Sequence, residues 1–227
     1  MDKNPLSFHT DFIYTDRETK ARYVYLKFGH VLRGSILDVG ADKCHLKHYL
    51  GKDVSYMGIG FGGSLDMKVD LEKEKIPFDD ESFDCVLCTD VLEHLDNIHA
   101  VFDELCRVSR KWVIVSLPSP WRTFYSMLKN GYYAEGRAMK FDGLPIEPPE
   151  DRHKWFFSSE EAERFVAYRA AKNNMRVIQM DFDSVSNEGA GLKGLLRRLL
   201  VCILFTSSVN TRNLYTGTLW AVLEKQD

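Results

Sequence analysis

The sequence predicts an α/β fold, with a doubly wound, mostly parallel sheet that carries helices on both faces. Short apolar segments alternate with amphipathic segments along the chain, which is the order of βαβ units and of parallel strands buried on both sides. The 227 residues suit one domain with some insertion. The apolar content of 44% and charged content of 28% are typical of a soluble globular protein. Without repeats or linkers, we expect residues 1–227 to form a single domain.

The first elements follow from the spacing of apolar side chains. Residues 15–32 have helical spacing, and Thr15 with Glu18 resembles a capping box. Short apolar runs predict three strands, with a helical segment between the first and the second. These strands are Ser35–Asp38, Ser55–Ile59 and Met67–Val69, and the helical segment includes Leu46–Leu50.

The second half repeats this alternation. Phe83–Cys88 and Trp112–Val115 are apolar runs typical of buried strands. Between them a helix is expected to begin at Asp96 or Asn97, with one apolar face formed by Ile98, Val101, Phe102, Leu105 and Val108. Ser158-Ser159-Glu160-Glu161 is a second capping-box pattern and predicts a helix to about Asn173. The last strands are expected at Arg176–Met180 and Leu219–Leu223.

Residues 119–157 interrupt the alternation. They are rich in proline and aromatic residues and show no sustained period, which indicates an ordered insertion or lid over the substrate.

Charge and cysteine content restrict the functional class. A net charge of −3 and a pI of about 6.2 give no general attraction to nucleic acid, so we expect no nucleic-acid partner. The five cysteines are scattered and follow no signal peptide, which predicts free thiols in the cytoplasm. Cys85 and Cys88 are three apart on a strand and should face opposite sides, so they should form neither a metal site nor a disulfide. The sequence contains no run of about 18 apolar residues, so we expect no membrane span.

Asp38-Val39-Gly40 ends the first strand in a tight turn. In open α/β sheets, ligands bind in the crevice at the carboxyl ends of the strands. Glycine permits both the turn and a close approach of the backbone to a ligand. Taken singly, Asp38 or Asp90 could instead be a helix N-cap, and Gly40 could be only a turn residue.

The order of such segments resembles the class I S-adenosylmethionine-dependent methyltransferases from about residue 35 to residue 117. The resemblance rests on Asp38-Val39-Gly40, Asp70-Leu71-Glu72, Pro77–Asp84, Asp90–His94 and the helix Phe102–Val108 leading into Val113–Pro118. It implies a seven-stranded Rossmann-like fold and S-adenosylmethionine as cofactor. The cofactor-binding residues that it implies are Asp38, Gly40, Ala41, Ile59, Gly60, Asp70, Leu71, Thr89 and Asp90. Asp70 and the Leu71 backbone would meet the adenine, and Thr89 and Asp90 would face the methionine moiety.

Three positions depart from the family pattern. Asp42 and Cys44 stand where further glycines are usual, and Gly60 stands where an acidic residue usually holds the ribose hydroxyls. Asp66 in the next turn could replace that acid. These departures suggest weaker or differently posed cofactor binding, and they leave a noncatalytic binding or scaffold protein as an alternative. A nucleotide-dependent dehydrogenase is disfavoured because the loop lacks the GxGxxG pattern.

The candidate catalytic residues are two histidines. Methyl transfer mainly requires proximity and orientation, and a hydroxyl acceptor usually also requires a general base. His94 follows the fourth strand of the match and His153 lies in the predicted lid, so both are candidates. Alternatively, His94 has a capping or packing role and His153 is a surface histidine. The other histidines show no ligand spacing, and we expect no metal.

The segment 151–157 mixes cations with aromatic residues, and Arg152 and Trp155 are its candidate substrate-binding residues. They suit a hydroxylated or anionic acceptor through charge-assisted hydrogen bonds, or they could pin the lid to the core.

The sequence thus favours methyl transfer to a hydroxyl of a small molecule or saccharide. Residues 143–157 and 212–224 resemble methyltransferases of surface-glycan biosynthesis, which favours a sugar hydroxyl. The stripe Leu192–Leu204, with Lys193, Arg197 and Arg198 opposite, could contact a membrane surface or cover a sheet face. A lipid or quinone acceptor is therefore an alternative.

Overall fold

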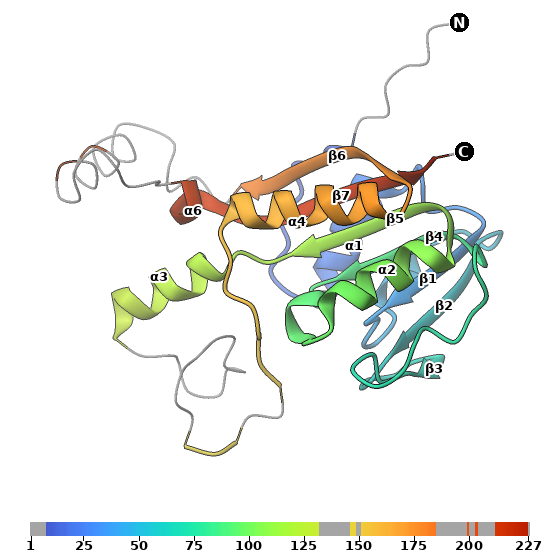
Figure 1. Cartoon of the computed structure of the whole chain (residues 1–227), viewed down its shortest axis with the longest axis horizontal. Helices are drawn as coiled ribbons and strands as arrows, with labels where there is room; N and C mark the ends of the chain where they lie inside the picture. Colours follow the sequence, from blue (N-terminus) through green and yellow to red (C-terminus); the bar gives the residue numbers. More distant parts are fainter. Residues whose placement is uncertain are drawn as a thin grey trace, which may run out of the picture.

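A seven-stranded sheet forms the centre of the protein, in the order β3-β2-β1-β4-β5-β7-β6 (Figure 1). The computed structural model describes residues 8–131, 146–148, 151–184, 199, 203 and 212–226. β1 to β5 pair in parallel, whereas β7 is antiparallel to both of its neighbours. The strands are β1 Ser35–Val39, β2 Ser55–Gly60, β3 Met67–Lys68, β4 Phe83–Thr89, β5 Ser109–Leu117, β6 Met175–Ser184 and β7 Thr216–Lys225. The predicted α/β fold is confirmed, and the sheet is mixed rather than purely parallel.

Helices cover both faces of this sheet. α2 (Ile98–Val108) and α4 (Ser159–Lys172) lie side by side on one face, and α1 (Arg17–Phe28) lies on the other (Figure 1). Two short 3₁₀ turns, η1 (His45–Tyr49) and η2 (Leu92–His94), follow β1 and β4. The remaining helices are α3 (Pro120–Asn130) and α6 (Arg212–Tyr215).

Each face of the sheet has its own apolar core, because strands buried on both sides send alternate side chains in opposite directions. Phe102 and Val166 lie in the core on the α2–α4 side, and Phe28 and Trp220 lie in the core on the α1 side. Cys85 belongs to the α1 side and Cys88 to the α2–α4 side, and both thiols are free. The prediction that these two cysteines face opposite ways is confirmed.

One of the two predicted helix caps is correct. Ser158 caps α4, since its hydroxyl accepts from Glu161 N at 3.1 Å and its own N–H donates to the Glu161 carboxylate at 2.7 Å. At α1 the predicted pair Thr15 and Glu18 is wrong by one position. The extended backbone that a cap requires lies at Asp16, whose carboxylate accepts from Thr19 N at 2.8 Å.

The predicted lid contains a helix that its irregular pattern did not reveal. α3 opens the segment with Pro120 at its first position, where the missing N–H has no helical partner to lose. Residues 132–145 and 149–150 of the lid lie outside the described residues, as does most of the Leu192–Leu204 stripe. Among the residues described, no helix is both long and apolar enough to cross a membrane.

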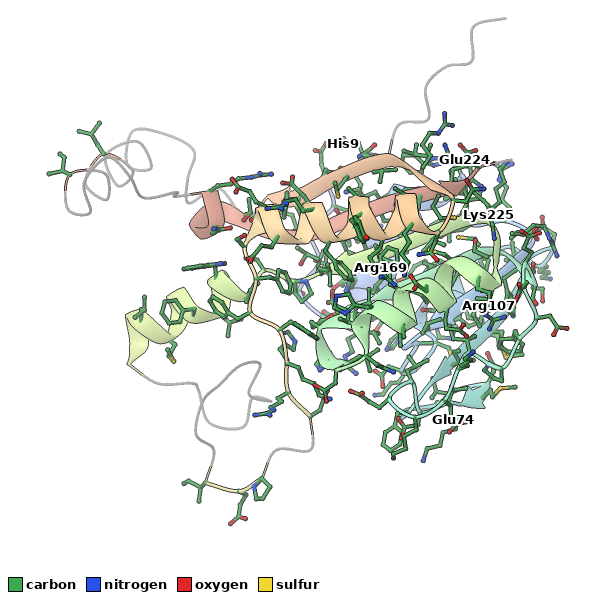
Figure 2. The ribbon with its side chains drawn as sticks, in the orientation of Figure 1. His9, Glu74, Arg107, Arg169, Glu224 and Lys225 are labelled. Carbon is green, nitrogen blue, oxygen red and sulfur yellow. The ribbon has the colours of Figure 1, made fainter. Side chains whose placement is uncertain are left out.

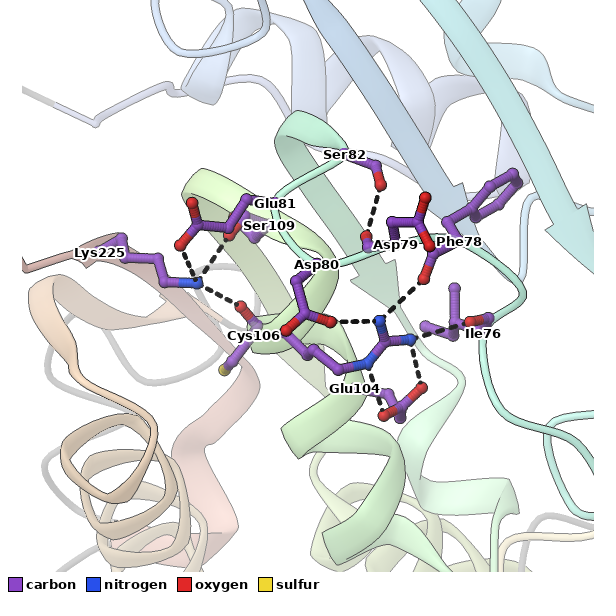
Figure 3. Close-up of polar contacts among 11 residues, drawn as sticks. Ile76, Phe78, Asp79, Asp80, Glu81, Ser82, Glu104, Cys106, Ser109 and Lys225 are labelled. Carbon is purple, nitrogen blue, oxygen red and sulfur yellow. Dashed lines mark hydrogen bonds and ion pairs between the residues drawn. The ribbon is translucent and has the colours of Figure 1, made fainter.

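Arg107 ties the loop before β4 to helix α2 (Figure 3). Its guanidinium donates to the carboxylates of Glu104 and Asp80 and to the backbone carbonyls of Ile76 and Phe78, all at 2.8–3.0 Å. The carboxylates raise the pKa of Arg107. On the other helix of this face, Arg169 points from α4 toward α2 and donates to the His99 carbonyl at 2.6 Å (Figure 2). These arginines fix the position of α2 relative to β4 and the elements that follow it.

Arg107→Met is expected to lower the free energy of unfolding by about 1–3 kcal/mol, because two carbonyls and two carboxylates lose their donor at once. Chemical denaturation measures this loss. Arg176→Met is the matched control, since Arg176 is 63% exposed and its partner among the described residues is Glu224. The control should change stability by less than about 0.5 kcal/mol. Equal losses in the two variants would contradict the role given to Arg107.

Candidate functional site

The loop after β1 lies against the ends of β2 and β4. The N–H groups of Gly40 and Ala41 both donate to the Ile59 carbonyl, at 2.7 and 3.2 Å. Gly40 has a φ of +84°, and a Cβ added there would lie 2.1 Å from Val91 Cγ2. This position therefore requires glycine for its conformation and for its close approach to the Val91 side chain.

Asp42 and Cys44, which stand where the resemblance predicts glycines, have left-handed backbone conformations. Their φ values are +50° and +53°. The Asp42 carboxylate pairs with Arg17 of α1 at 2.6 Å, and the buried Cys44 thiol donates to the Ser64 carbonyl at 3.4 Å. The loop thus keeps the backbone path of a glycine-rich turn. Arg17 offsets the added charge of Asp42.

Asp38 supplies a partly buried acidic group near the end of β1. Tyr56 donates its hydroxyl to the Asp38 carboxylate at 2.7 Å. Burial raises the pKa of Asp38 to about 6, although the Tyr56 hydrogen bond and the nearby Lys20 lower it. A carboxylate held at this energetic disadvantage is well suited to stabilise a positive charge that binds beside it.

Asp90 follows β4 and is held from two sides. Its N–H donates to Ser116 Oγ at 3.0 Å, and the Ser116 hydroxyl donates back to the Asp90 carboxylate at 2.7 Å. Lys20 of α1 forms an ion pair with the same carboxylate. Asp90 has a φ of +55°, so the chain turns sharply here. The Lys20 ammonium therefore lies among the acidic groups that end β1 and β4.

Gly60 stands where the resemblance places an acidic residue for the ribose hydroxyls, and Asp66 is the candidate to replace that acid. A Cβ at Gly60 would meet only ordinary contacts, at 3.4 Å from Gly40 Cα and 3.6 Å from Leu65 Cδ1. The Asp66 carboxylate accepts from Gly58 N at 2.8 Å and from Lys47 Nζ at 3.1 Å. Asp66 thus holds its own loop to β2. Nothing in these contacts supports it as a substitute for the family acid.

Asp70 lies just beyond β3, where the resemblance places the adenine. Its carboxylate accepts from Glu72 N at 3.2 Å and from Lys73 Nζ at 2.8 Å. The Lys73 hydrogen bond lowers the pKa of Asp70. The buried Leu71 offers its carbonyl to Asn97 Nδ2 at 2.8 Å, which fixes this turn to the start of α2.

His94 and His153 are brought together, although 58 residues separate them. Their rings are 4.5 Å apart between centroids and nearly perpendicular. The Nε2 atom of each ring lies 3.7 Å from Glu93 Oε1, and Glu93 and His153 are buried. His94 Nδ1 lies 2.8 Å from the Asp151 carboxylate. We call Glu93, His94, His153 and Asp151 the histidine cluster. Sequence reasoning missed Glu93 and Asp151, although each lies within two residues of a predicted histidine.

The segment 151–157 is fixed to the turn after β4. Lys154 N donates to the Glu93 carbonyl at 2.8 Å, and the Lys154 ammonium pairs with Asp96 at 2.7 Å and with Glu72. Trp155 Nε1 donates to the Leu95 carbonyl at 2.7 Å. Trp155 thus pins the segment to the core, which was the alternative reading of this aromatic residue. Arg152 is exposed.

Residues 46–115 match a family model described as a methyltransferase domain. No curated protein matches the sequence significantly.

Three solved structures share the fold at low identity. An S-adenosylmethionine-dependent methyltransferase from Archaeoglobus fulgidus aligns with a TM-score of 0.57 at 15% identity, over 93% of this chain and 95% of that one. A putative sarcosine dimethylglycine methyltransferase from Galdieria sulphuraria aligns with a TM-score of 0.54 at 12% identity, over 92% and 86%. The magnesium protoporphyrin IX methyltransferase of Synechocystis PCC 6803, solved with bound S-adenosylhomocysteine, aligns with a TM-score of 0.52 at 11% identity, over 92% and 83%.

The family match supports a methyltransferase, and the solved structures show that the chain shares its fold with such enzymes. The matched segment 46–115 includes Asp70, Asp90 and His94.

Proposed function

We propose that this methyltransferase acts on a hydroxyl group of a small molecule or saccharide. The proposal rests on one observation: Glu93 and His94 follow β4 within five residues of its last residue, Thr89, and the fold brings His153 and Asp151 to them there. A hydroxyl acceptor must lose its proton, and a histidine near the transferred group can take it.

The residues at the strand ends fit S-adenosylmethionine. When bound, this cofactor supplies a methyl group on a positively charged sulfonium sulfur. Asp38 and Asp90 place carboxylates where a cation would be stabilised, and both already interact with the Lys20 ammonium. Gly40, Ala41, Ile59 and Gly60 would supply the backbone wall, and Asp70 with Leu71 would hold the adenine amine. Thr89 would lie beside Asp90 at the methionine end.

His94 is the proposed general base, with His153 behind it. His94 is partly exposed, at 27% for its side chain, so an acceptor can reach its ring, whereas His153 is buried. The hydroxyl oxygen gains the methyl group as its proton passes to an imidazole nitrogen, which later releases the proton to solvent. Asp151 would stabilise the imidazolium formed at His94. Arg152, exposed beside the cluster, would contact polar groups of the acceptor.

The proposed adenine contact is tested by calorimetry with S-adenosylhomocysteine. The wild-type chain should bind this product, and Asp70→Ala should weaken binding about tenfold or more, because a charged hydrogen-bond partner is lost. Asp53→Ala is the matched control, since Asp53 is exposed just before the amino end of β2. Affinity in the control should not change.

Two results would count against these assignments. Unchanged affinity in Asp70→Ala would refute the adenine contact. Absence of binding at high micromolar ligand by folded wild-type protein would refute the enzymatic proposal and favour a noncatalytic protein with this fold.

A further inference from the structure

We propose that Glu93, His94 and His153 form a binding site for one divalent transition-metal cation of the Zn²⁺ type. No metal is expected from the sequence, because these ligands come from two segments that only the fold brings together. Their ligand atoms all lie within 4.8 Å of one another.

The separations suit ligands that share a cation. Both Nε2 atoms lie 3.7 Å from the same carboxylate oxygen, Glu93 Oε1. Direct hydrogen bonds would be about 2.7–3.2 Å long, so these nitrogens do not donate to that oxygen. Two ligands each about 2.1 Å from a tetrahedral Zn²⁺ lie about 3.4 Å apart. The two distances to Glu93 therefore exceed the ideal separation by about 0.3 Å. The full set lies within 4.8 Å, so the two histidine rings would have to approach one another to share the ion.

Asp151 lies beside His94, on the side of the ring away from the proposed cation. Its carboxylate is 2.8 Å from His94 Nδ1, which is an ion-pair distance without the alignment of a hydrogen bond. Its negative charge favours a proton on Nδ1 and so leaves the Nε2 lone pair for a metal, and a carboxylate near the second nitrogen is a usual feature of histidine-liganded metals. Neutral imidazole at Nε2 is the form that binds cations.

The site is buried on one side and rigidly supported. Glu93 is fully buried and His153 is 4% exposed, so a bound cation would interact with them in a medium of low dielectric constant. The Lys154 backbone bond to the Glu93 carbonyl and the Trp155 bond to the Leu95 carbonyl hold both segments in place. Little ordering is therefore needed on binding, which favours affinity.

The ligand set indicates which cation would bind. Two imidazoles and one carboxylate suit Zn²⁺ and similar transition metals, whereas Mg²⁺ and Ca²⁺ prefer sites made of oxygen ligands. Three protein ligands leave a coordination position open. His94 is the most exposed of the three, so the open position would lie on its side, toward an acceptor.

The role of this cation rests on the proposed function and would replace the base role of His94 there, because a ring whose Nε2 binds a metal and whose Nδ1 carries a proton cannot accept another proton. If the acceptor is a hydroxyl compound, its oxygen could occupy the open position and become more acidic there. The binding site itself stands on geometry and is testable without cofactor or acceptor.

The experiment is a metal titration of the full chain after chelator dialysis. Zn²⁺ binding is followed by calorimetry, and Co²⁺ binding by its visible d–d absorption. The wild type should bind one equivalent. The nearly isosteric Glu93→Gln should weaken binding by 100-fold or more. Asp151→Asn should weaken it by about 10–100-fold, as expected for a partner that orients a ligand.

A control variant and an exposed test residue make the metal titration interpretable. His48→Asn removes an exposed histidine of η1 and should leave the single tight site unchanged. The Asp151 side chain is 60% exposed, so Asp151→Asn tests the site even if changes at the buried residues prevent folding.

Failure of this inference is distinguishable from failure of the proposed function. Folded wild-type protein without a stoichiometric site, or with one insensitive to Glu93→Gln and Asp151→Asn, would overturn the metal site. S-adenosylhomocysteine binding that depends on Asp70 would then still support the methyltransferase. A metal site in a protein that binds no S-adenosylhomocysteine would leave the inference standing and remove the proposed function.

Discussion

Replacing Gly40 with alanine is expected to abolish binding of S-adenosylhomocysteine and to lower the free energy of unfolding by on the order of 2–4 kcal/mol. At a φ of +84° any side chain is strained, and the new Cβ would lie 2.1 Å from Val91 Cγ2. The loop must move away from the segment after β4, and the walls of the proposed pocket would separate. Chemical denaturation and calorimetry measure the two effects.

Gly60→Ala is the matched control for this change. Gly60 ends the neighbouring strand, but its added Cβ would be 3.4 Å or more from every neighbouring atom. We expect its free energy of unfolding to change by less than about 1 kcal/mol. Similar losses at Gly60 and Gly40 would show that the sharp turn and close approach at Gly40 are not the cause.

Asp38→Asn is expected to separate stability from cofactor binding. At pH 7 to 8 the partly buried Asp38 carboxylate is ionised at an energetic disadvantage, because burial raises its pKa to about 6. Asparagine resembles the neutral form and can still accept from Tyr56, so the variant should be as stable as the wild type or more stable. Affinity for S-adenosylmethionine should fall by about 10–100-fold, because a charged partner of the sulfonium is lost.

The pH dependence of the wild type follows from the same group. The pKa of Asp38 is about 6 in the folded protein against an ordinary value of 3.8, so the folded state binds more protons between these values. The contribution of Asp38 to stability is therefore largest below about pH 4 and is lost as the pH rises through 6, by on the order of 3 kcal/mol. Asp38→Asn should remove this part of the pH profile.

Cofactor affinity should have the opposite dependence. Only ionised Asp38 can stabilise the cation, so the wild-type affinity for S-adenosylmethionine should fall as the pH is lowered below about 6. Calorimetry at several pH values measures this change, and S-adenosylhomocysteine, which lacks the sulfonium charge, should show a smaller one. Equal pH profiles for both ligands would contradict the assignment of Asp38.

Most strands and helices could be predicted because their signals are local. Short apolar runs indicate the buried strands β1, β4 and β5. Apolar residues at helical spacing indicate the single apolar face of α2. The position of the α1 cap was misjudged because several adjacent polar residues can cap, and only the backbone path selects Asp16. α3 was missed because prolines and aromatic residues obscure its helical period.

The candidate site was partly predictable. Asp38, Gly40 and Asp90 follow predicted strands directly, and parallel strands bring their carboxyl ends to one edge of a sheet. Lys20 was not predicted because it reaches Asp90 from α1, across 70 residues of chain. The left-handed conformations of Asp42 and Cys44 could not be predicted from the sequence, because neither residue is a glycine and only glycine is a clear signal of a positive φ.

The α/β architecture, the acidic residues at the strand ends and the glycine turn at Gly40 follow from the amino-acid order, because they depend on local periodicity and on the succession of segments. The cluster of Glu93, His94, His153 and Asp151 forms only in the folded chain. Fifty-six residues separate His94 from the start of segment 151–157. The position of that segment depends on specific long-range contacts of Lys154 and Trp155, for which the sequence has no periodic signal.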